Sequence, residues 1–192
     1  MSRVAFDAKR KAGVDKNYTV KEYTPESLAI DCISKLPIQK EDLCLDCSRG
    51  INPVWFNNFP TTNKDFCEID EDKIFLEYNT KVDWVIGNPP FRGFVDFCYH
   101  ASKISKKGFG FLINHSRLNQ LTTKRLDDFA EKGFYFNGIF VVGVAKWFGR
   151  YYFVSFSKEK KANVCWERKT YKEGVGGIPT KSKDLDILPT IL

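Results

Sequence analysis

The stretch Val82–Phe91, VDWVIGNPPF, begins like a strand and stops abruptly. Its first five residues are mostly β-branched or aromatic, a composition typical of buried strands. Gly87 and Asn88 then lead into two prolines, which cannot continue a central strand. The stretch therefore predicts a core strand that ends in a rigid loop, with the Asn88 amide and the Phe91 ring at its end.

The segments around this strand alternate between helix and strand patterns. Residues 22–36 predict a helix with Thr24 as its cap, Pro25 at its first position and Pro37 as its stop. Further strands are predicted at 43–46, 65–69 and 108–116, further helices at 94–107 and 122–133, and a hairpin from 138–147 and 151–158. This order predicts a single three-layer α/β domain over residues 1–192, with a mainly parallel sheet closed by the hairpin.

Polar residues follow three of the predicted strands. Asp46 with the loop to Asn52, Glu68, and the run from Asn88 all come at carboxyl ends of strands. In parallel sheets, ligands bind beyond these ends. We therefore expect the three segments to share one rim and one ligand site.

The Asn-Pro-Pro-Phe run suits chemistry on an exocyclic amine. Such an amine is a poor nucleophile because its lone pair is delocalised into the ring, and two acceptors on its N–H groups would favour a reactive, more tetrahedral nitrogen. Asn88 offers a side-chain oxygen, and Pro89 offers a backbone carbonyl in a fixed direction. Phe91 offers a π-face for an extruded base. A plain proline-terminated strand is the alternative interpretation.

NPPF after an apolar strand resembles the catalytic motif of amino-group methyltransferases that use S-adenosylmethionine, in particular the N6-adenine branch and its small phage-type members. The resemblance covers most of the chain. It implies a Rossmann-like methyltransferase fold whose last strand is antiparallel in a mainly parallel sheet. It also implies a catalytic set of Asn88, Pro89, Pro90 and Phe91, with S-adenosyl-L-methionine as the cofactor. The implied substrate is the N6 amine of adenine in nucleic acid, with DNA favoured over RNA.

Three further segments resemble cofactor motifs in the expected order. EYTP at 22–25 resembles the motif before the first helix, LDCSRGIN at 45–52 the first cofactor loop, and CEID at 67–70 the acid that holds the ribose hydroxyls. The resemblance implies that Asp46 lies near the methionine amino group or fixes the loop. The cofactor-binding residues that it implies are Tyr23, Thr24, Pro25, Asp46, Ser48, Gly50, Glu68 and Phe75.

Several positions depart from this pattern, and one of them is Cys47, which stands where a proline often follows the first acid. Asn52 stands where the family loop usually has a second glycine, although asparagine tolerates left-handed backbone. Arg49 is bulky for a cofactor loop. Asp72 is displaced by two residues from the acid that usually precedes the aromatic residue, here Phe75. These departures leave weak cofactor binding open.

The net charge of +6 favours a polyanionic partner, with a solvated basic surface as the alternative. The basic clusters lie at 9–11, 103–107, 158–161 and 168–172. Residues 1–22 are expected to form a basic arm and residues 159–192 a charged tail. Arg92 and Arg150 are further candidates for phosphate contacts. An oligomer or a partner subunit would also be compatible with so small a chain.

The chain shows neither a membrane-length apolar run nor a secretory signal, so a cytoplasmic location and no membrane partner are expected. Cys44 and Cys47 form a CxxC without a second pair or a nearby histidine, so no metal site is expected. His100 and His115 are isolated and are not expected to be catalytic, although the rim position of His115 suits a residue that lines a substrate site.

Several other functions stay open at this point. An RNA adenine methyltransferase would use the same motif. A protein-glutamine methyltransferase needs the same acceptors for an amide nitrogen, but its motif carries a tyrosine where this chain has Phe91. A degenerate cofactor loop would instead leave a catalytically weak, nucleic-acid-binding partner subunit.

Overall fold

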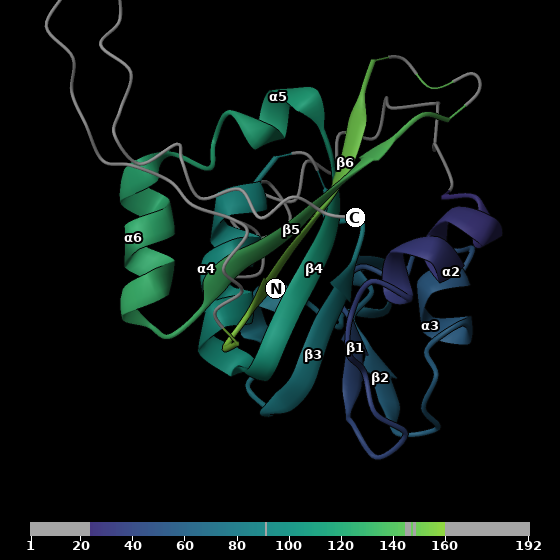
Figure 1. Cartoon of the computed structure of the whole chain (residues 1–192). Helices are drawn as coiled ribbons and strands as arrows, with labels where there is room; N and C mark the ends of the chain where they lie inside the picture. The colour runs from purple at the N-terminus through teal and green to yellow at the C-terminus, as the bar shows by residue number, and fades with distance from the viewer. Residues whose placement is uncertain (1–23, 91, 145–146, 148, 160–192) are drawn as a thin grey trace, which may run out of the picture.

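The computed structural model describes residues 24–90, 92–144, 147 and 149–159 (Figure 1). Its six-stranded sheet has the order β2-β1-β3-β4-β6-β5. The strands are β1 (Cys44–Asp46), β2 (Lys64–Phe66), β3 (Val82–Gly87), β4 (Ser105–Asn114), β5 (Tyr135–Val142) and β6 (Tyr151–Ser157). Pairs among β1, β2, β3 and β4 are parallel, whereas β6 runs antiparallel to both β4 and β5. The predicted antiparallel last strand is confirmed.

Helices cover both faces of this sheet, which gives three layers (Figure 1). One face packs against α2 (Glu26–Ile33) and α3 (Val54–Asn57), and the other against α4 (Phe94–Ile104) and α6 (Thr123–Glu131). The short α5 (His115–Leu118) and the 3₁₀ helices η1 (Ile69–Glu71) and η2 (Phe75–Glu77) complete the described elements. The Rossmann-like α/β architecture expected from the sequence is therefore present.

The strand β3 lies between β1 and β4, and its side chains belong to the hydrophobic clusters on both faces of the sheet. Trp84 and Ile86 pack on the side of α2 and α3, while Val85 packs on the side of α4 and α6. All three are essentially inaccessible to solvent. The apolar first half of VDWVIGNPPF is explained by this position, because a strand buried on both faces needs apolar side chains on both.

Several element boundaries differ from the prediction, and local hydrogen bonds explain them. The helix α4 ends at Ile104 instead of residue 107, because Ser105 turns to extended backbone and its hydroxyl bonds the Ala101 carbonyl at 2.7 Å. The strand β4 then begins at Ser105, three residues early. β2 stops at Phe66, and Glu68 forms only an isolated bridge with Lys73.

The predicted helix ends are partly right. Within the predicted segment 122–133, Thr122 caps α6 through the Arg125 N–H, and Gly133 follows the helix with φ at +78°. The Thr24 cap is wrong, since Pro25 occupies the cap position of α2 and makes no side-chain bond there. The predicted basic arm and most of the charged tail lie outside the described residues. None of the described helices is long and apolar enough to cross a membrane.

Candidate functional site

The carboxyl ends of β1, β2 and β3 meet at one edge, and three of the predicted groups converge there. The Gly50 N–H donates to Glu68 Oε2 at 2.5 Å. The Ser48 hydroxyl donates to the backbone carbonyl of Asn88 at 2.8 Å. The loop after β1 is thus bonded both to the acid after β2 and to the Asn-Pro-Pro run after β3.

Two cavities adjoin at this loop and share the lining residues Ser48, Gly50, Glu68 and Asn88. One has a volume of about 230 Å³ and extends past Ile74, Phe75 and Phe97. The other has a volume of about 260 Å³ and extends past Thr24, Asn52 and Trp55. Because polar groups stand at the junction, an elongated ligand could place one end in each cavity and a polar middle between them.

The first cavity has a mostly apolar wall. Phe75 is buried, and its ring packs against Phe97 with centroids 4.7 Å apart and edge-to-face against His100 at 4.9 Å. Such a wall suits a flat aromatic ligand. Asp72 does not line this cavity, so its displacement in the sequence corresponds to a real displacement in space. The cofactor contact expected of Phe75 is geometrically available there, and Glu68 is the one acidic residue among the described residues that line this cavity.

Glu68 stands at the junction of the two cavities. Its carboxylate accepts the Gly50 N–H and, at 3.1 Å, the Asp70 N–H. A carboxylate in this position, after the second strand of a Rossmann-like sheet, suits a ribose diol. The geometry is compatible with the ribose-binding role predicted for this residue.

Asp46 is fully buried and lines neither cavity. Its Oδ1 accepts the Ser48 N–H at 3.1 Å, whereas Oδ2 has no hydrogen-bond partner in the described part of the chain. Burial raises the pKa of this carboxyl to about 7, and the Glu68 charge adds to the rise, while the N–H groups of Ser48 and Phe56 oppose it. Of the two roles considered for Asp46, this geometry favours fixing the loop.

The loop after β1 turns at Gly50, where φ is +66° and a Cβ would find open space. Among the described residues, Asp72 is the sole non-glycine with positive φ, so Asn52 does not use the left-handed region that was considered for it. Arg49 is accommodated at the edge: its guanidinium lies 3.7 Å from the centre of the Phe66 ring and pairs with Glu71. A bulky side chain in this loop is therefore compatible with the trough, as the two adjoining cavities together are called.

The Asn-Pro-Pro run after β3 lies at this junction. Asn88 and Pro90 line the first cavity and Pro89 is buried beside them. The Asn88 amide Nδ2 lies 3.5 Å from the Thr24 hydroxyl, and Asn88 Oδ1 accepts no hydrogen bond from the described residues. Phe91 and Tyr23 lie outside the described residues, and Pro25 lines neither cavity.

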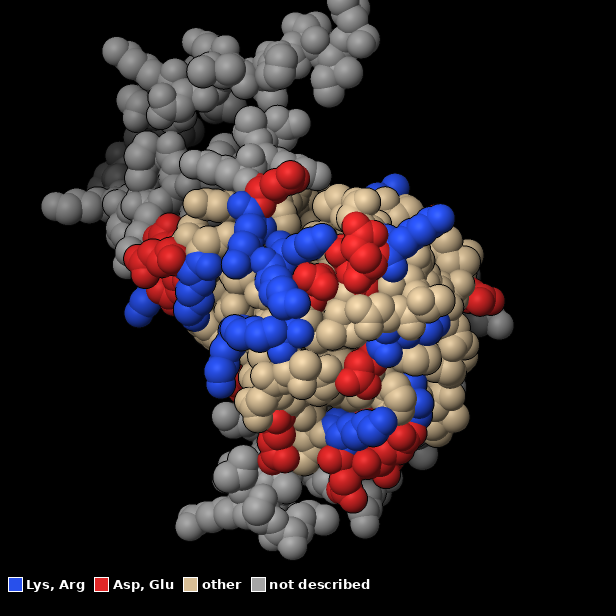
Figure 2. Space-filling model, turned by 90° about the horizontal axis from the view of Figure 1, so that it is seen from below, with Lys and Arg blue, Asp and Glu red and all other residues tan. Residues whose placement is uncertain are grey.

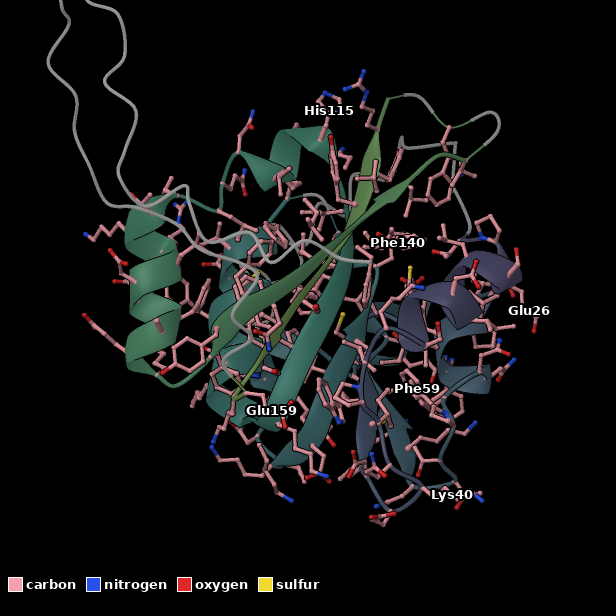
Figure 3. The ribbon with its side chains drawn as sticks, viewed as in Figure 1. Glu26, Lys40, Phe59, His115, Phe140 and Glu159 are labelled. Atoms are coloured by element: carbon pink, nitrogen blue, oxygen red, sulfur yellow. The ribbon has the colours of Figure 1, made fainter. Side chains whose placement is uncertain are left out.

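The histidines and cysteines have structural surroundings. His100 is half-buried, its Nε2 bonds the Tyr78 carbonyl at 2.9 Å, and burial lowers its pKa. His115 is exposed on α5 at the upper end of the sheet (Figure 3) and packs on Gly149. Cys44 and Cys47 are buried free thiols whose pKa values burial raises, to about 12 for Cys44. The described residues contain no group of three potential metal ligands.

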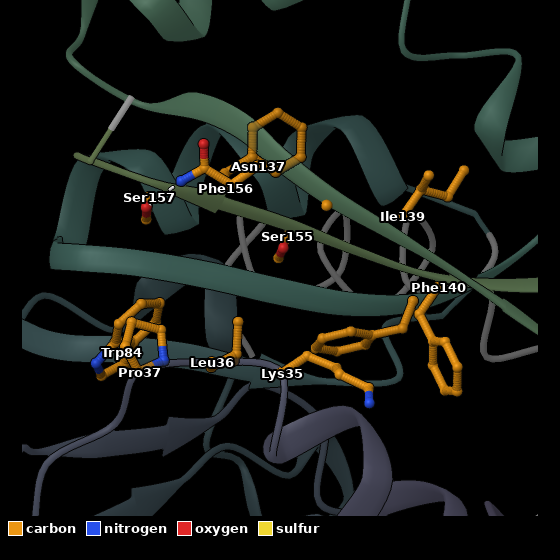
Figure 4. Close-up of a pocket in the computed structure, with 12 residues that line it drawn as sticks. Lys35, Leu36, Pro37, Trp84, Asn137, Ile139, Phe140, Ser155, Phe156 and Ser157 are labelled. Carbon is orange, nitrogen blue, oxygen red and sulfur yellow. Dashed lines mark hydrogen bonds between the residues drawn. The ribbon is translucent and has the colours of Figure 1, made fainter. Parts of the chain in front are cut away.

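A third cavity, of about 260 Å³, opens on the sheet face that carries α2 and contains no predicted site residue (Figure 4). It lies between Lys35 and Leu36, in the segment just after α2, and the hairpin residues Phe140 and Phe153. The Lys35 ammonium stands over the Phe140 ring at 5.1 Å. Trp147, at the hairpin tip, packs on Tyr151 with ring centroids 4.5 Å apart, so its ring contributes to packing within the hairpin.

Basic side chains gather on the face at the amino ends of the strands, with acidic groups among them (Figure 2). Lys106 and Lys107 lie near the start of β4 at this end, and they pair with Asp83 and Asp42, at 3.9 and 2.5 Å respectively. Lys158 lies at the same end, because its N–H bonds the Lys107 carbonyl. The 103–107 cluster therefore faces away from the candidate site, whereas the exposed Arg92 and Arg150 lie on loops at the site's end of the sheet.

Two contacts of the site had no signal in the sequence. Thr24 and Trp55 come together through the indole N–H, which donates to the Thr24 hydroxyl at 3.3 Å. Ser48 meets Asn88 across 40 positions of the chain. Neither pair has a spacing that a local pattern reports. Only the strand order, which places β1 beside β3, brings Ser48 and Asn88 together.

No protein-family model and no curated protein matches the sequence. Solved structures match over most of the chain. A Pyrococcus horikoshii protein assigned as an RNA methyltransferase shows 17% identity and a TM-score of 0.55, with 82% of this chain and 98% of that chain covered. A Listeria monocytogenes protein assigned as a class I S-adenosylmethionine-dependent methyltransferase shows 12% identity and a TM-score of 0.58, covering 86% and 69%. A Pyrococcus furiosus methyltransferase shows 12% identity and a TM-score of 0.51, covering 80% and 95%. The chain therefore has the fold of class I methyltransferases.

Proposed function

We propose that this protein is an S-adenosylmethionine-dependent methyltransferase that methylates the N6 amine of adenine in nucleic acid, with DNA as the favoured substrate. The observation that carries the proposal is the position of Asn88. Its amide stands at the junction of the two cavities, at the carboxyl end of a central strand, in a class I methyltransferase fold.

The residues of the trough fit the cofactor. Gly50 leaves room for a ligand near the backbone, Glu68 suits the ribose hydroxyls, and the wall at Phe75 suits the adenine. The second cavity, at Thr24 and Trp55, would take the methionine end. When bound, the cofactor supplies an electrophilic methyl group on a sulfonium.

The remaining chemistry belongs to this chain. Asn88 Oδ1 and the Pro89 carbonyl accept the two N–H groups of the substrate amine and so make its lone pair available. The amine nitrogen would take the methyl group from the cofactor's sulfonium, whose bond to that methyl would break, and it would release one proton to water. No ionised base is required, because the proton leaves after the transfer. Phe91 would stack the extruded base.

RNA is the second candidate substrate, supported by the RNA methyltransferase assignment of the Pyrococcus horikoshii neighbour. Both candidates share the same amine chemistry. Protein-glutamine methylation is a weaker candidate because its motif carries a tyrosine at the position of Phe91. In the partner-subunit alternative, the loop with Arg49 would fail to hold the cofactor.

One experiment tests the function and its alternatives together. The purified protein is incubated with methyl-labelled S-adenosylmethionine and either unmethylated DNA or unmethylated RNA, and the digested nucleosides are analysed by mass spectrometry. We expect labelled N6-methyladenine from DNA. The label in RNA would move the substrate to the second candidate. If calorimetry detected no binding of S-adenosylmethionine, the alternative of a catalytically weak partner subunit would remain. If the cofactor bound but neither substrate carried labelled adenine, the proposal would be refuted.

A further inference from the structure

Asn88 is held at both ends by side chains from other parts of the chain. Its backbone carbonyl accepts the Ser48 hydroxyl at 2.8 Å, and its amide Nδ2 faces the Thr24 hydroxyl at 3.5 Å. Ser48 comes from the loop after β1, and Thr24 from the segment just before α2. The Asn88 amide is thus fixed by groups outside its own loop.

The Ser48 hydroxyl has one proton, which it donates to the backbone carbonyl of Asn88. The bond has the length of a well-formed O–H···O hydrogen bond. Ser48 is in turn held by its own N–H, which donates to the buried Asp46 at 3.1 Å. The chain of contacts therefore runs from a buried carboxyl through Ser48 to the backbone that carries the amide.

Thr24 acts on the other end of the residue. It is almost fully buried, and its oxygen accepts the Trp55 indole N–H at 3.3 Å. With Nδ2 of Asn88 directed at this oxygen, Oδ1 is the end of the amide that stays available for a substrate N–H. The 3.5 Å contact is long, so we expect Thr24 to contribute less than Ser48.

We propose that Ser48 and Thr24 are positioning residues that fix Asn88 for methyl transfer, and that Ser48 acts chiefly on the catalytic loop and not as a cofactor ligand. This inference rests on the proposed function. An amide that accepts a substrate N–H needs a fixed direction, because small misplacements of positioned groups lower rates strongly. If both residues instead acted only as cofactor contacts, as the sequence predicts, their variants would raise the cofactor Kd and leave kcat unchanged.

The test compares Ser48→Ala and Thr24→Val with wild type, using labelled S-adenosylmethionine and unmethylated DNA and RNA. Cofactor affinity is measured by calorimetry, and kcat is measured at saturating cofactor. We expect Ser48→Ala to lower kcat at least about tenfold, with its cofactor Kd within about twofold of wild type, and Thr24→Val to lower kcat less. Ser48→Thr and Thr24→Ser keep the hydroxyl and should recover most of the rate.

Two matched controls separate positioning from general loss of a buried hydroxyl. Ser102→Ala removes a hydroxyl that donates to the Tyr99 carbonyl, also at 2.8 Å, on α4. Thr61→Val removes a hydroxyl that donates to the Lys40 carbonyl at 2.8 Å, and Thr61 is as buried as Thr24. Both lie outside the trough, so both variants should keep the wild-type kcat.

The outcomes distinguish a failure of the proposed function from a failure of the positioning inference. A wild-type protein that transfers no methyl group overturns the proposed function and this inference with it. If the wild type is active but Ser48→Ala keeps the wild-type kcat, the inference alone is overturned, whether or not the cofactor Kd of this variant is raised. An independent readout is the Trp55 indole N–H resonance in NMR, which Thr24→Val should shift and Thr61→Val should not.

Discussion

Asn88 is the side chain on which the proposed chemistry most directly depends. Replacing it with alanine removes an acceptor that Pro89 cannot supply, so we expect Asn88→Ala to lower the methyl-transfer rate by about a hundredfold or more. The fold should survive, because the side chain is only half-buried and Oδ1 has no partner among the described residues. Kinetics with labelled cofactor, together with the thermal unfolding midpoint, measure both effects.

The matched control is Asn79→Ala. Asn79 is exposed in the loop before β3, at the opposite end of this strand, and its amide donates only to the nearby Glu77 carbonyl. We expect this variant to keep the wild-type rate. Equal rates in the Asn88 and Asn79 variants would remove Asn88 from the mechanism.

The raised pKa of Asp46 predicts that the free energy of unfolding depends on pH. Its pKa of about 7 in the folded state lies above the ordinary value of 3.8 that applies when the chain is unfolded. Between these two values the folded state holds a proton that the unfolded state has released. This group therefore lowers the free energy of unfolding by about 1.4 kcal/mol for each pH unit that the pH rises from 4 to 7.

The variant Asp46→Asn removes this proton linkage while keeping the shape of the side chain. We expect its free energy of unfolding to depend less on pH between 4 and 7 than that of wild type. Urea denaturation at several pH values measures the difference. Parallel profiles for the two proteins would mean that Asp46 ionises in the folded state at its ordinary pKa.

The packing between β3, β4 and β6 depends on a glycine. A Cβ on Gly108 would collide with the Phe156 carbonyl oxygen and stand 2.5 Å from the Trp84 ring. Gly108→Ala must therefore push apart strands that are paired by hydrogen bonds, and we expect a loss of about 2 kcal/mol in the free energy of unfolding. Denaturant titration against wild type gives the value.

Gly143→Ala is the corresponding control, because a Cβ at Gly143 meets nothing within 4 Å and its φ is not positive. It should change the free energy of unfolding by less than about 0.5 kcal/mol. If both alanine variants were equally stable, the close approach of β6 to Gly108 would be disproved.

Local pattern predicted most of this molecule's elements, because apolar runs and caps act over short distances. The buried half of β3, the Thr122 cap and the glycine after α6 were all readable in this way. The Thr24 cap failed for the opposite reason: its hydroxyl is recruited by Trp55, 31 positions away. The candidate site was predicted as a rim, but the bonds that fix Asn88 cross between elements and carry no periodic signal.

The Asp42 side chain ties three distant parts of the chain together below the sheet. Its carboxylate accepts the Gln39 N–H at 3.0 Å, the Trp84 indole N–H at 2.9 Å and the Lys107 ammonium at 2.5 Å, and it is 2% exposed. Burial alone would raise its pKa, but these hydrogen bonds outweigh the burial and lower it, so the charged form is the stable one.

Removing this carboxylate should therefore affect the whole molecule. Asp42→Ala leaves the buried Trp84 indole N–H without its acceptor, and we expect a loss of about 3 kcal/mol in the free energy of unfolding, measured by urea denaturation. Lys106→Ala is the comparison: its ion pair with Asp83 spans 3.9 Å at a side chain that is 56% exposed, so the loss should stay below about 0.5 kcal/mol. Because Asp42 lies at the amino ends of the strands, away from the trough, the folded fraction of Asp42→Ala should bind S-adenosylmethionine with the wild-type Kd. A weakened Kd at full folding would show that the two ends of the sheet are energetically coupled, which the present contacts do not predict.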